Sequence, residues 1–408
     1  MSTGLESLAG SLRLRPGEAI PDNLISTRRN WSAQLTRGRA AAELPAFVAC
    51  LYNLCGQSHA LCSQLALNAA SDTEAIAHTG AVRLQCETAR EHIRRIALDW
   101  PRLFSGSDRQ AGVGGPRPHT RLQPDLAQCP ALGRSDLHAD ALGTTREWLE
   151  NGWIGLPLKR WLEQWQRQGD HWLLIWSRQS HTWLASLFRE AFAITGSSGA
   201  ISINQTPAQP PRLEWIAGNR HAMFAALADK LHNDNAFSLR PQLGMQCAQT
   251  GTWTRHYESF NSPDSLTGRL GSRIADLLRL CLPDSPGASG AGWLASGGLN
   301  LGPGRGVAWL EMARGLLIHT VQLDSSHLAT ATVESYQVLA PTEWNFHPMG
   351  AVARYLESYQ PEDPALGQKV GLLIAAFDPC VPFSLPEFES DEVPLRGKLM
   401  TRAGINHA

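Results

Sequence analysis

The sequence contains no run of 18 consecutive apolar residues, so it offers no segment that could span a membrane as a helix. Its 36 basic and 37 acidic residues nearly cancel, which leaves a formal net charge of −1. Proteins that bind nucleic acid generally carry a clear basic excess, so this balance argues against that class. Charged residues make up 18% and hydrophobic residues 43% of the chain, which excludes a highly charged disordered protein.

The sequence also lacks the two common signals for export, a secretion signal and a twin-arginine signal. The first twenty residues hold no continuous apolar segment of the kind that a secretion signal needs. The pair Arg28-Arg29 is not followed by such a segment either, so there is no twin-arginine signal. We therefore expect a protein that is cytoplasmic, or is carried by a partner, and that has no membrane partner.

Cysteines at C-x-x-C spacing are absent, which excludes zinc ribbons and thioredoxin-type redox motifs. In a long cytoplasmic chain the eight cysteines are expected to be free thiols, most of them buried as small hydrophobic residues. They stand at positions 50, 55, 62, 86, 129, 247, 281 and 380.

The spacing of apolar residues predicts a mainly helical protein. Helices are expected at 45–67 with an interruption at Gly56, 75–100 ended by Pro101, 158–168, 172–192, 216–232, 265–282 and 348–358. The tryptophans at 161–183 favour a buried core stripe over a ligand site. Alternating apolar residues predict two strands, 316–323 and 331–339. Segments rich in Gly, Pro and Ser are expected to be irregular near 105–145, 195–212 and 282–306.

One group of residues could bind a metal near the first helix. If Ser58 caps a helix, His59 and Cys62 lie one turn apart, with Cys55 just before that turn. Two thiols and an imidazole suit a soft or borderline metal ion. The alternative is that the cysteines are buried and the histidine is hydrogen-bonded in the core.

Two later segments also carry candidate chemistry. Cys380, flanked by Pro379 and Pro382, is a thiol held rigidly after an apolar run, although an inert buried thiol fits that pattern as well. Arg314 next to Gly315 could direct a fork of N–H donors at an anion. The commoner fate of a single arginine is a surface ion pair.

Taken in order, six segments resemble motifs of the nickel–iron hydrogenase large subunit. Cys55-Gly56 resembles the start of that family's R-I-C-G-x-C-x-x-x-H, 313–315 resembles A-P-R-G, and 377–380 resembles the start of S-F-D-P-C-x-x-C-x-x-H. Residues 341–345 resemble V-P-T-T-W-N. The six segments are 8–14, 38–56, 251–255, 313–315, 341–345 and 377–380. The resemblance is faint between about 100 and 240.

The departures from those motifs bear on function. The second cysteine of each metal-binding pair is replaced, by Ser58 and by Phe383. The histidine of each motif is replaced, by Cys62 and by Pro386, and the glutamate of the N-terminal motif is Ala9. A chain without half of the thiolates and without that carboxylate is not expected to build or run a nickel–iron site, so we expect no enzyme activity.

The retained residues are those that suit an Fe(CN)2(CO) fragment without nickel. In the family, the arginine and the hydroxyl that correspond to Arg314 and Thr342 hydrogen-bond the cyanide ligands of iron, which implies a cofactor-binding role here. Cys55 and Cys380 would supply thiolates to the metal. Because they correspond to cysteines that bind only nickel, iron would sit differently here, and Cys62 is a further candidate metal ligand.

This pattern resembles the HupK/HoxV type of hydrogenase assembly protein. The resemblance implies a non-catalytic scaffold in hydrogenase maturation that transiently carries Fe(CN)2(CO) to the large subunit. Its expected partners are maturation chaperones of the HypC/HypD kind and the hydrogenase large subunit, with no nucleic acid. It implies an α+β, predominantly α-helical fold, with a helix bundle and a small peripheral sheet. A single domain, 1–408, is expected.

The same resemblance places the N-terminal strand and the 316–339 hairpin in one small sheet, and it brings the segments of Cys55 and Cys380 together. Two other functions remain open at this stage. A divergent metal-dependent oxidoreductase could use Cys55, Cys62, His59 and Cys380 in a rearranged site. A metal-free docking module for maturation chaperones could use the tryptophan-rich helices as a surface.

Overall fold

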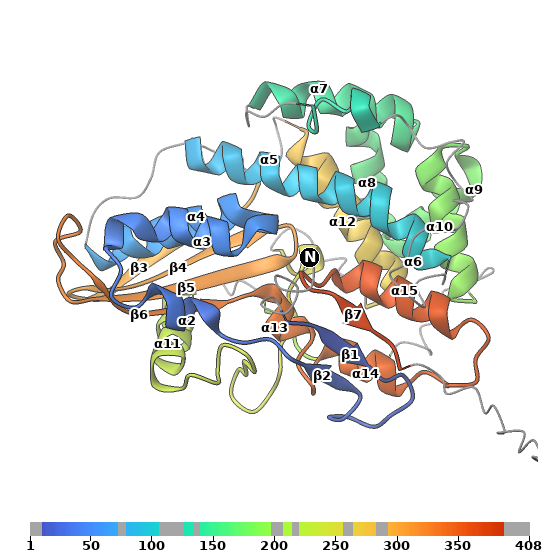
Figure 1. Cartoon of the computed structure of the whole chain (residues 1–408). Coiled ribbons are helices and arrows are strands. Elements are labelled where there is room, and N and C mark those ends of the chain that lie inside the picture. Colours follow the sequence, from blue (N-terminus) through green and yellow to red (C-terminus); the bar gives the residue numbers. More distant parts are fainter. Residues whose placement is uncertain are drawn as a thin grey trace, which may run out of the picture.

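The computed structural model describes residues 10–71, 79–105, 126–133, 139–196, 207–213, 220–255, 264–282 and 293–386. A four-stranded antiparallel sheet lies beside a group of packed helices, and a small second sheet joins the two ends of the described chain (Figure 1). Ala9, the residues before it and the residues after Pro386 lie outside the described residues. Within the described part, no helix is long and apolar enough to cross a membrane.

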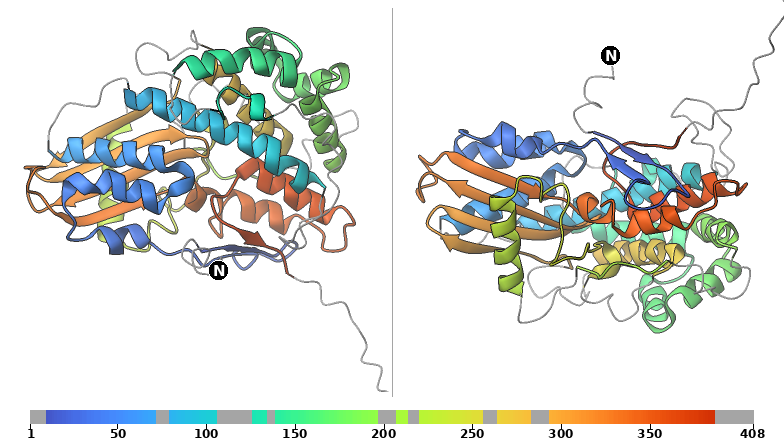
Figure 2. Two further views of the ribbon diagram at one scale, coloured as in Figure 1. Left: turned by 45° about the horizontal axis from the view of Figure 1, so that its top comes forward. Right: turned by 90° about the horizontal axis from the view of Figure 1, so that it is seen from below.

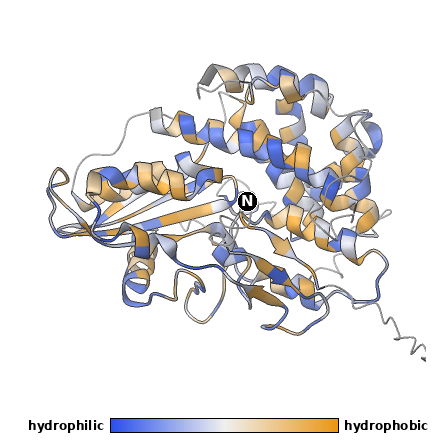
Figure 3. Cartoon of the chain, viewed as in Figure 1, coloured by the Kyte–Doolittle hydropathy of each residue, from blue (hydrophilic) through white to orange (hydrophobic). Residues whose placement is uncertain are grey.

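The larger sheet has the strand order β3–β4–β5–β6, with every neighbouring pair antiparallel. Its strands are β3 (Ser296–Gly302), β4 (Arg305–Met312), β5 (Gly315–Leu323) and β6 (Val333–Leu339). Successive side chains of a strand point to opposite faces, and here both faces are buried along β4 and β5. Their apolar residues are visible along the centre of the sheet (Figure 3).

Helices cover both faces of this sheet (Figure 2). On one face lie α3 (Leu44–Leu51) and α4 (Gly56–Ala70). On the other face lies α11 (Arg220–Asn233), whose Phe224 stacks on Trp309 with ring centroids 4.0 Å apart. The short helix α2 (Trp31–Thr36) packs at the β6 edge.

The helical part surrounds α12 (Leu266–Leu280), in which every residue is buried. Packed against it are α5 (Thr79–Arg94), α8 (Leu158–Gln168), α9 (Asp170–Gln179), α10 (Trp183–Ile194) and α15 (Leu366–Phe377). Farther out, a π-helical turn (Arg95–Asp99) and α6 (Trp100–Phe104) continue from α5, and α7 (Ala139–Leu149) packs on α5. The tryptophans of α8 to α10 are core residues, as expected, except for the half-buried Trp172. Trp161 meets Trp176 edge to face with ring centroids 5.8 Å apart.

The second sheet has the order β2–β1–β7. Strand β1 (Leu12–Leu14) pairs antiparallel with β2 (Leu24–Ser26) and parallel with β7 (Phe383–Ser384). The N-terminal strand and the 316–339 hairpin therefore belong to different sheets, so the expectation that they share one sheet is wrong. The consequence for the site is that β7 fixes the chain three residues after Cys380.

Several expected boundaries also need correction. The helix expected to end at Pro101 continues through the π-helical turn, because proline fits the first turn of α6. The helix expected over 172–192 is two helices, since Thr182 caps α10 by accepting a hydrogen bond from the Ala185 N–H. Within the segments expected to be irregular, 139–145 is helical and 296–306 carries β3 and the start of β4.

Gly371 in α15 permits a very close approach to α6, the helix beside it. A Cβ at this position would lie 1.9 Å from the carbonyl oxygen of Leu103. Gly371→Ala is therefore expected to lower the free energy of unfolding by about 1–3 kcal/mol, measured by urea denaturation. Gly143→Ala in α7 is the matched control, because a Cβ there meets nothing within 4 Å and alanine favours a helix. Equal stability of the two variants would contradict this packing.

Candidate functional site

The two motif cysteines come together although they lie 325 positions apart. Cys55 ends a short 3-10 helix (Asn53–Cys55) directly before α4, and Cys380 follows the end of α15. Each thiol lies close enough to the other that a negative charge on Cys380 raises the pKa of Cys55. The expected convergence of the two segments is therefore confirmed.

Arg314 forms hydrogen bonds to the loop that carries Cys380 and to helix α5. It stands in the turn between β4 and β5, and its Nε donates to the backbone carbonyl of Asp378 at 3.1 Å. One terminal nitrogen, Nη2, donates to Glu91 of α5. The other, Nη1, is buried and has no hydrogen-bond partner among the described residues. A buried donor left without an acceptor is costly, so this atom has the capacity to donate to one further acceptor.

Arg314 stays protonated and positively charged in the folded protein. Burial would lower its pKa, but Asp378 and Glu91 outweigh burial, and the thiols of Cys55 and Cys380 add to their effect, so the pKa is raised. The guanidinium is therefore a fixed cation beside the two thiols. The alternative expectation for this residue, a surface ion pair, is wrong, because Arg314 is buried.

Asp378 shapes the loop that carries Cys380. It has φ of 48°, a left-handed conformation that aspartate tolerates better than most residues. Its carboxylate accepts from Arg273 Nη1 at 2.9 Å and lies 3.1 Å from Arg95 Nε. Burial would raise the pKa of Asp378, but Arg314, Arg95 and Arg273 outweigh it and hold the pKa well below its usual range. The loop is thus anchored by ion pairs to three different elements.

The Cys380 thiol has two further polar neighbours. The Thr342 hydroxyl at the start of α13 (Pro341–Asn345) lies 3.2 Å from Sγ, and Arg28 Nη1 donates to Sγ at 3.4 Å. Arg28 Nε in turn donates to Glu343 at 2.5 Å. Burial opposes the charge on Arg28, but Glu343 and Cys380 outweigh it and raise the pKa of Arg28. The Cys380 sulfur therefore has a guanidinium and a hydroxyl as direct neighbours.

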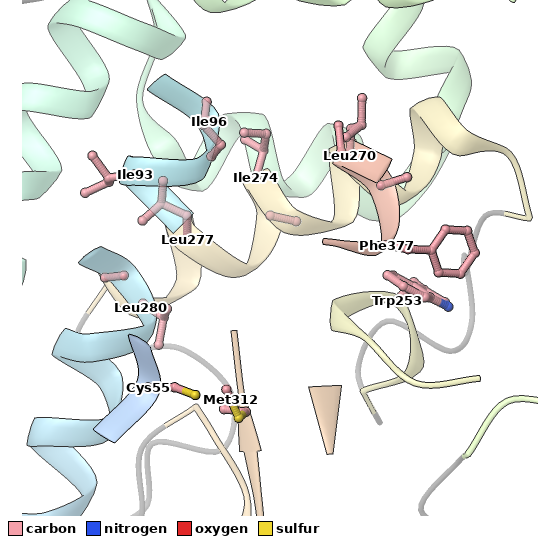
Figure 4. Close-up of a cluster of buried hydrophobic side chains, with 14 of the residues drawn as sticks. Cys55, Ile93, Ile96, Trp253, Leu270, Ile274, Leu277, Leu280, Met312 and Phe377 are labelled. Atoms are coloured by element: carbon pink, nitrogen blue, oxygen red, sulfur yellow. The ribbon is translucent and has the colours of Figure 1, made fainter. Parts of the chain in front are cut away.

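Cys55 has a different environment from Cys380. It is one of a cluster of buried apolar side chains that includes Met312, Leu280 and Trp253 (Figure 4). Burial raises the pKa of the Cys55 thiol, and Arg314 only partly offsets that effect. The site thus has one thiol against the core and one, Cys380, that is partly exposed.

Ser58 stands at the position where the hydrogenase motif has its second cysteine, and here it is hydrogen-bonded to Glu87. Its hydroxyl and its N–H both donate to Glu87 of α5, and the Gln57 N–H donates to the same carboxylate at 2.8 Å. A carboxylate at the N-terminus of α4 satisfies free backbone N–H groups. Burial raises the pKa of Glu87, and these hydrogen bonds oppose that effect.

His59 belongs to a buried chain of hydrogen bonds. Its Nδ1 lies 3.1 Å from Nε2 of His319, and Nδ1 of His319 lies 2.5 Å from the Tyr336 hydroxyl. The ring of Tyr52 stacks on His59 with centroids 4.0 Å apart. Burial lowers the pKa of His59 to about 3, with Arg28 and Arg314 adding to the effect, so this imidazole is neutral.

Cys62 lies apart from the two motif thiols. Seven residues along the chain from Cys55, it sits about two helical turns away. Its thiol packs between α4 and the sheet, 4.0 Å from the carbonyl oxygen of Leu317. This position gives no support to the expectation that Cys62 joins the ligand set.

Cys62→Ala is accordingly expected to leave any metal bound at Cys55 and Cys380 in place. It is expected to cost about 1 kcal/mol of stability through lost packing. The measurement is the metal content of the purified variant beside its urea denaturation curve. A folded variant that has lost its metal would establish Cys62 as a ligand.

Within the described residues, no group of three or more His, Cys, Asp and Glu side chains is arranged to hold a metal ion. The site offers two thiols, surrounded by N–H and O–H donors. Such a set suits a metal that arrives with further ligands of its own, particularly anionic ones that accept hydrogen bonds.

Two known proteins are similar in sequence to this chain over most of its length. A scan against protein-family profiles finds no match. The hydrogenase expression/formation protein HoxV of Cupriavidus necator is 36% identical over 398 residues, which cover 94% of this chain and 97% of that protein. The hydrogenase expression/formation protein HupK of Bradyrhizobium diazoefficiens is 30% identical over 383 residues, covering 90% and 93%.

Among solved structures, a reduced, active form of the Ni-Fe-Se hydrogenase from Desulfomicrobium baculatum matches with a TM-score of 0.50 at 13% identity. The match covers 88% of this chain and 93% of that chain. The fold is thus that of nickel–iron hydrogenase large subunits, as expected. The relatives in sequence identify the family: the chain belongs to the hydrogenase expression/formation proteins named HoxV and HupK.

The structure adds residues that sequence reasoning missed. Arg28 and Glu343 border Cys380, while Glu87 and Glu91 border the other side of the site. Glu91 lies four residues after Glu87 in a predicted helix, which is a spacing that places both on one face. That spacing was the one available signal for the pair.

Proposed function

We propose that this protein is a non-catalytic scaffold of hydrogenase maturation that carries Fe(CN)2(CO) as cargo between Cys55 and Cys380. The observation that carries the proposal is the unpartnered Nη1 of Arg314 beside two thiols. In the hydrogenase large subunit that this chain resembles, the corresponding arginine hydrogen-bonds a cyanide. The protein's own family name, hydrogenase expression/formation protein, fits a role in maturation.

The donor set supports this particular cargo. Two thiolates bring an iron that already holds three diatomic ligands to five ligands, so the fragment itself supplies most of the coordination shell. Arg314 Nη1 can donate to one cyanide nitrogen. The Thr342 hydroxyl, 3.2 Å from the Cys380 sulfur, is placed to donate to a second. Charge-assisted donors of this kind are the ones that suit anionic ligands.

The replaced cysteines argue against nickel. The Ser58 hydroxyl is held by Glu87 and is not free to bind a metal. Phe383 pairs with Leu12 in the small sheet and packs against the core. Neither position offers a soft ligand to hold nickel next to iron. We infer a scaffold without hydrogenase activity for the same reason.

The partners follow from the proposed cargo. A carrier must receive the fragment from one protein and pass it to another. We propose chaperones of the HypC/HypD kind as donors and the hydrogenase large subunit as the acceptor. We further propose that the exchange takes place in the cytoplasm.

Infrared spectroscopy is the decisive test. The protein is purified without oxygen from cells that express the hydrogenase maturation machinery, and its iron and nickel are assayed. Cyanide and carbonyl stretching bands with iron and without nickel are expected. Protein without bands and without iron would overturn the carrier function. Bands together with nickel would instead indicate an enzyme.

A further inference from the structure

The segments that lead to the two thiols carry exposed arginines and exposed apolar side chains. Residues 10–54 contain six arginines and no lysine, against three acidic residues, in a chain whose net charge is −1. Three of these arginines are exposed, and no acidic side chain of the described residues forms an ion pair with any of them. They are Arg13, Arg29 and Arg37.

Apolar residues lie among these arginines. The described residues include six large hydrophobic side chains that are exposed, and three of the six fall in this region: Leu54 at 51%, Leu35 at 43% and Ile25 at 37%. Strand register places Ile25 directly opposite Arg13, on the outer face of the small sheet. We call these six residues, Arg13, Ile25, Arg29, Leu35, Arg37 and Leu54, the rim surface.

The rim surface is joined to the site through neighbouring residues. Leu54 directly precedes Cys55, and Arg29 directly follows Arg28, whose Nη1 contacts the Cys380 sulfur at 3.4 Å. Arg13 pairs with Ser384, four residues after Cys380. Figure 2 shows β1 and β2 beside β7. A molecule that contacts Leu54, Arg29 and Arg13 would therefore lie next to the segments that hold the two thiols.

We infer that the rim surface docks a partner protein through an acidic, partly apolar face. Exposed arginines that form no ion pair within the described residues fit carboxylates, and exposed leucine and isoleucine fit apolar side chains. Arginine is favoured at protein interfaces and lysine is depleted there, which matches this surface. A nucleic acid backbone is the poorer fit, because its binding relies on charge and does not use exposed aliphatic residues.

Docking at this position has a chemical consequence, which rests on the proposed carrier function. A ligand exchange between two proteins requires that the second protein's thiolate reach the metal. Cys380 is the more exposed of the two thiols, so the cargo is open to exchange from that side. The rim surface therefore orients the partner toward Cys380.

The test measures binding to the rim surface directly. Purified large-subunit precursor and purified chaperones of the HypC/HypD kind are titrated separately into the full chain by calorimetry, at low and at high salt. For at least one of them, the triple variant Arg13→Glu, Arg29→Glu, Arg37→Glu is expected to bind about tenfold or more weakly at low salt. Leu54→Ser is expected to weaken binding at both salt concentrations, because an apolar contact is not screened.

A matched control separates the surface from general charge. Arg94, Arg160 and Arg167 are exposed on α5 and α8, and their triple change to Glu is expected to leave the affinity unchanged. Equal weakening by both triple variants would overturn the inference, as would binding by none of the proteins tested. A DNA duplex is titrated in parallel. Tighter binding of that duplex, lost in the rim variant, would assign the surface to nucleic acid and overturn the inference as well.

The outcome is separable from that of the carrier function. If wild-type protein shows iron and cyanide bands but the rim variant binds its partner normally, the docking inference fails and the carrier function stands. If wild-type protein lacks the bands while the rim variant loses its partner, the docking surface stands without the cargo. The measurements therefore test the two claims independently.

Discussion

Cys380→Ser and Cys55→Ser are each expected to abolish the infrared bands and the bound iron of the anaerobically purified protein. A serine hydroxyl is a far harder and more weakly acidic ligand than a thiol, so it cannot replace a thiolate on iron(II). Each change is expected to lower iron occupancy at least about tenfold, since even the loss of an outer hydrogen-bond partner of a metal ligand costs that much.

The two variants are expected to differ in stability. Cys55 is buried in the apolar cluster, so serine there also introduces a polar group into the core. Cys380 is partly exposed and already surrounded by donors, so its serine variant is expected to keep wild-type stability. Cys50→Ser is the control, because Cys50 is exposed on α3, near Cys55 in the chain. Full retention of iron by both motif variants would refute the proposed ligation.

Arg314→Met is expected to destabilise the fold by about 3 kcal/mol. The substitution keeps most of the side-chain volume but removes a buried cation from Glu91 and Asp378. Both carboxylates keep the guanidinium of Arg95, which limits the loss. The free energy of unfolding is measured by urea denaturation at neutral pH.

Acid titration distinguishes the ionic role of Arg314 from simple packing. The pKa of Asp378 is lowered in the folded protein, so its ion pairs stabilise the fold above the unfolded-state value of about 3.9. That stabilisation is lost as the pH falls below about 4. The Arg314→Met variant is expected to lose less stability over this acid range than wild type. An unchanged acid dependence would show that Arg314 acts through volume alone.

Arg314→Lys separates charge from donor geometry. Lysine keeps the positive charge near Asp378 but lacks the planar fork that reaches Glu91, the Asp378 carbonyl and a third acceptor together. We expect a folded protein whose cyanide stretching frequencies are shifted or whose iron is lost. Thr342→Val is the companion variant, because it removes the second proposed donor while keeping the side-chain shape.

The convergence of the two cysteine segments could be predicted from the order of motifs, as could the position of Arg314. The neighbours of Cys380 could not. Arg28 touches its sulfur across 352 positions of sequence, and no local pattern around Arg28-Arg29 indicates such a contact. The spacing of Glu87 and Glu91 indicates only that they share a helix face. It does not show that Glu87 accepts hydrogen bonds at the N-terminus of another helix.

The strand β3 was missed for a physical reason. Its sequence, SGGLNLG, is rich in the glycine that usually marks a turn. Here the glycines allow close packing instead: a Cβ on Gly298 would lie 3.1 Å from the Leu65 carbonyl oxygen in α4. On the neighbouring strand, a Cβ on Gly306 would lie 2.3 Å from the Ala66 carbonyl oxygen. Composition alone does not separate a glycine used in a turn from one used under a helix.

The distance in sequence between the two thiols has a consequence for synthesis of the chain. A nascent polypeptide presents Cys55 early, but it presents Cys380 only when nearly the whole sequence has been translated. Strand β7, which fixes the Cys380 loop by pairing with β1, comes later still. A truncated product therefore has neither the second thiol nor its anchor. If the protein carries the proposed cargo, a chain that stops before Cys380 cannot hold that cargo through both thiols.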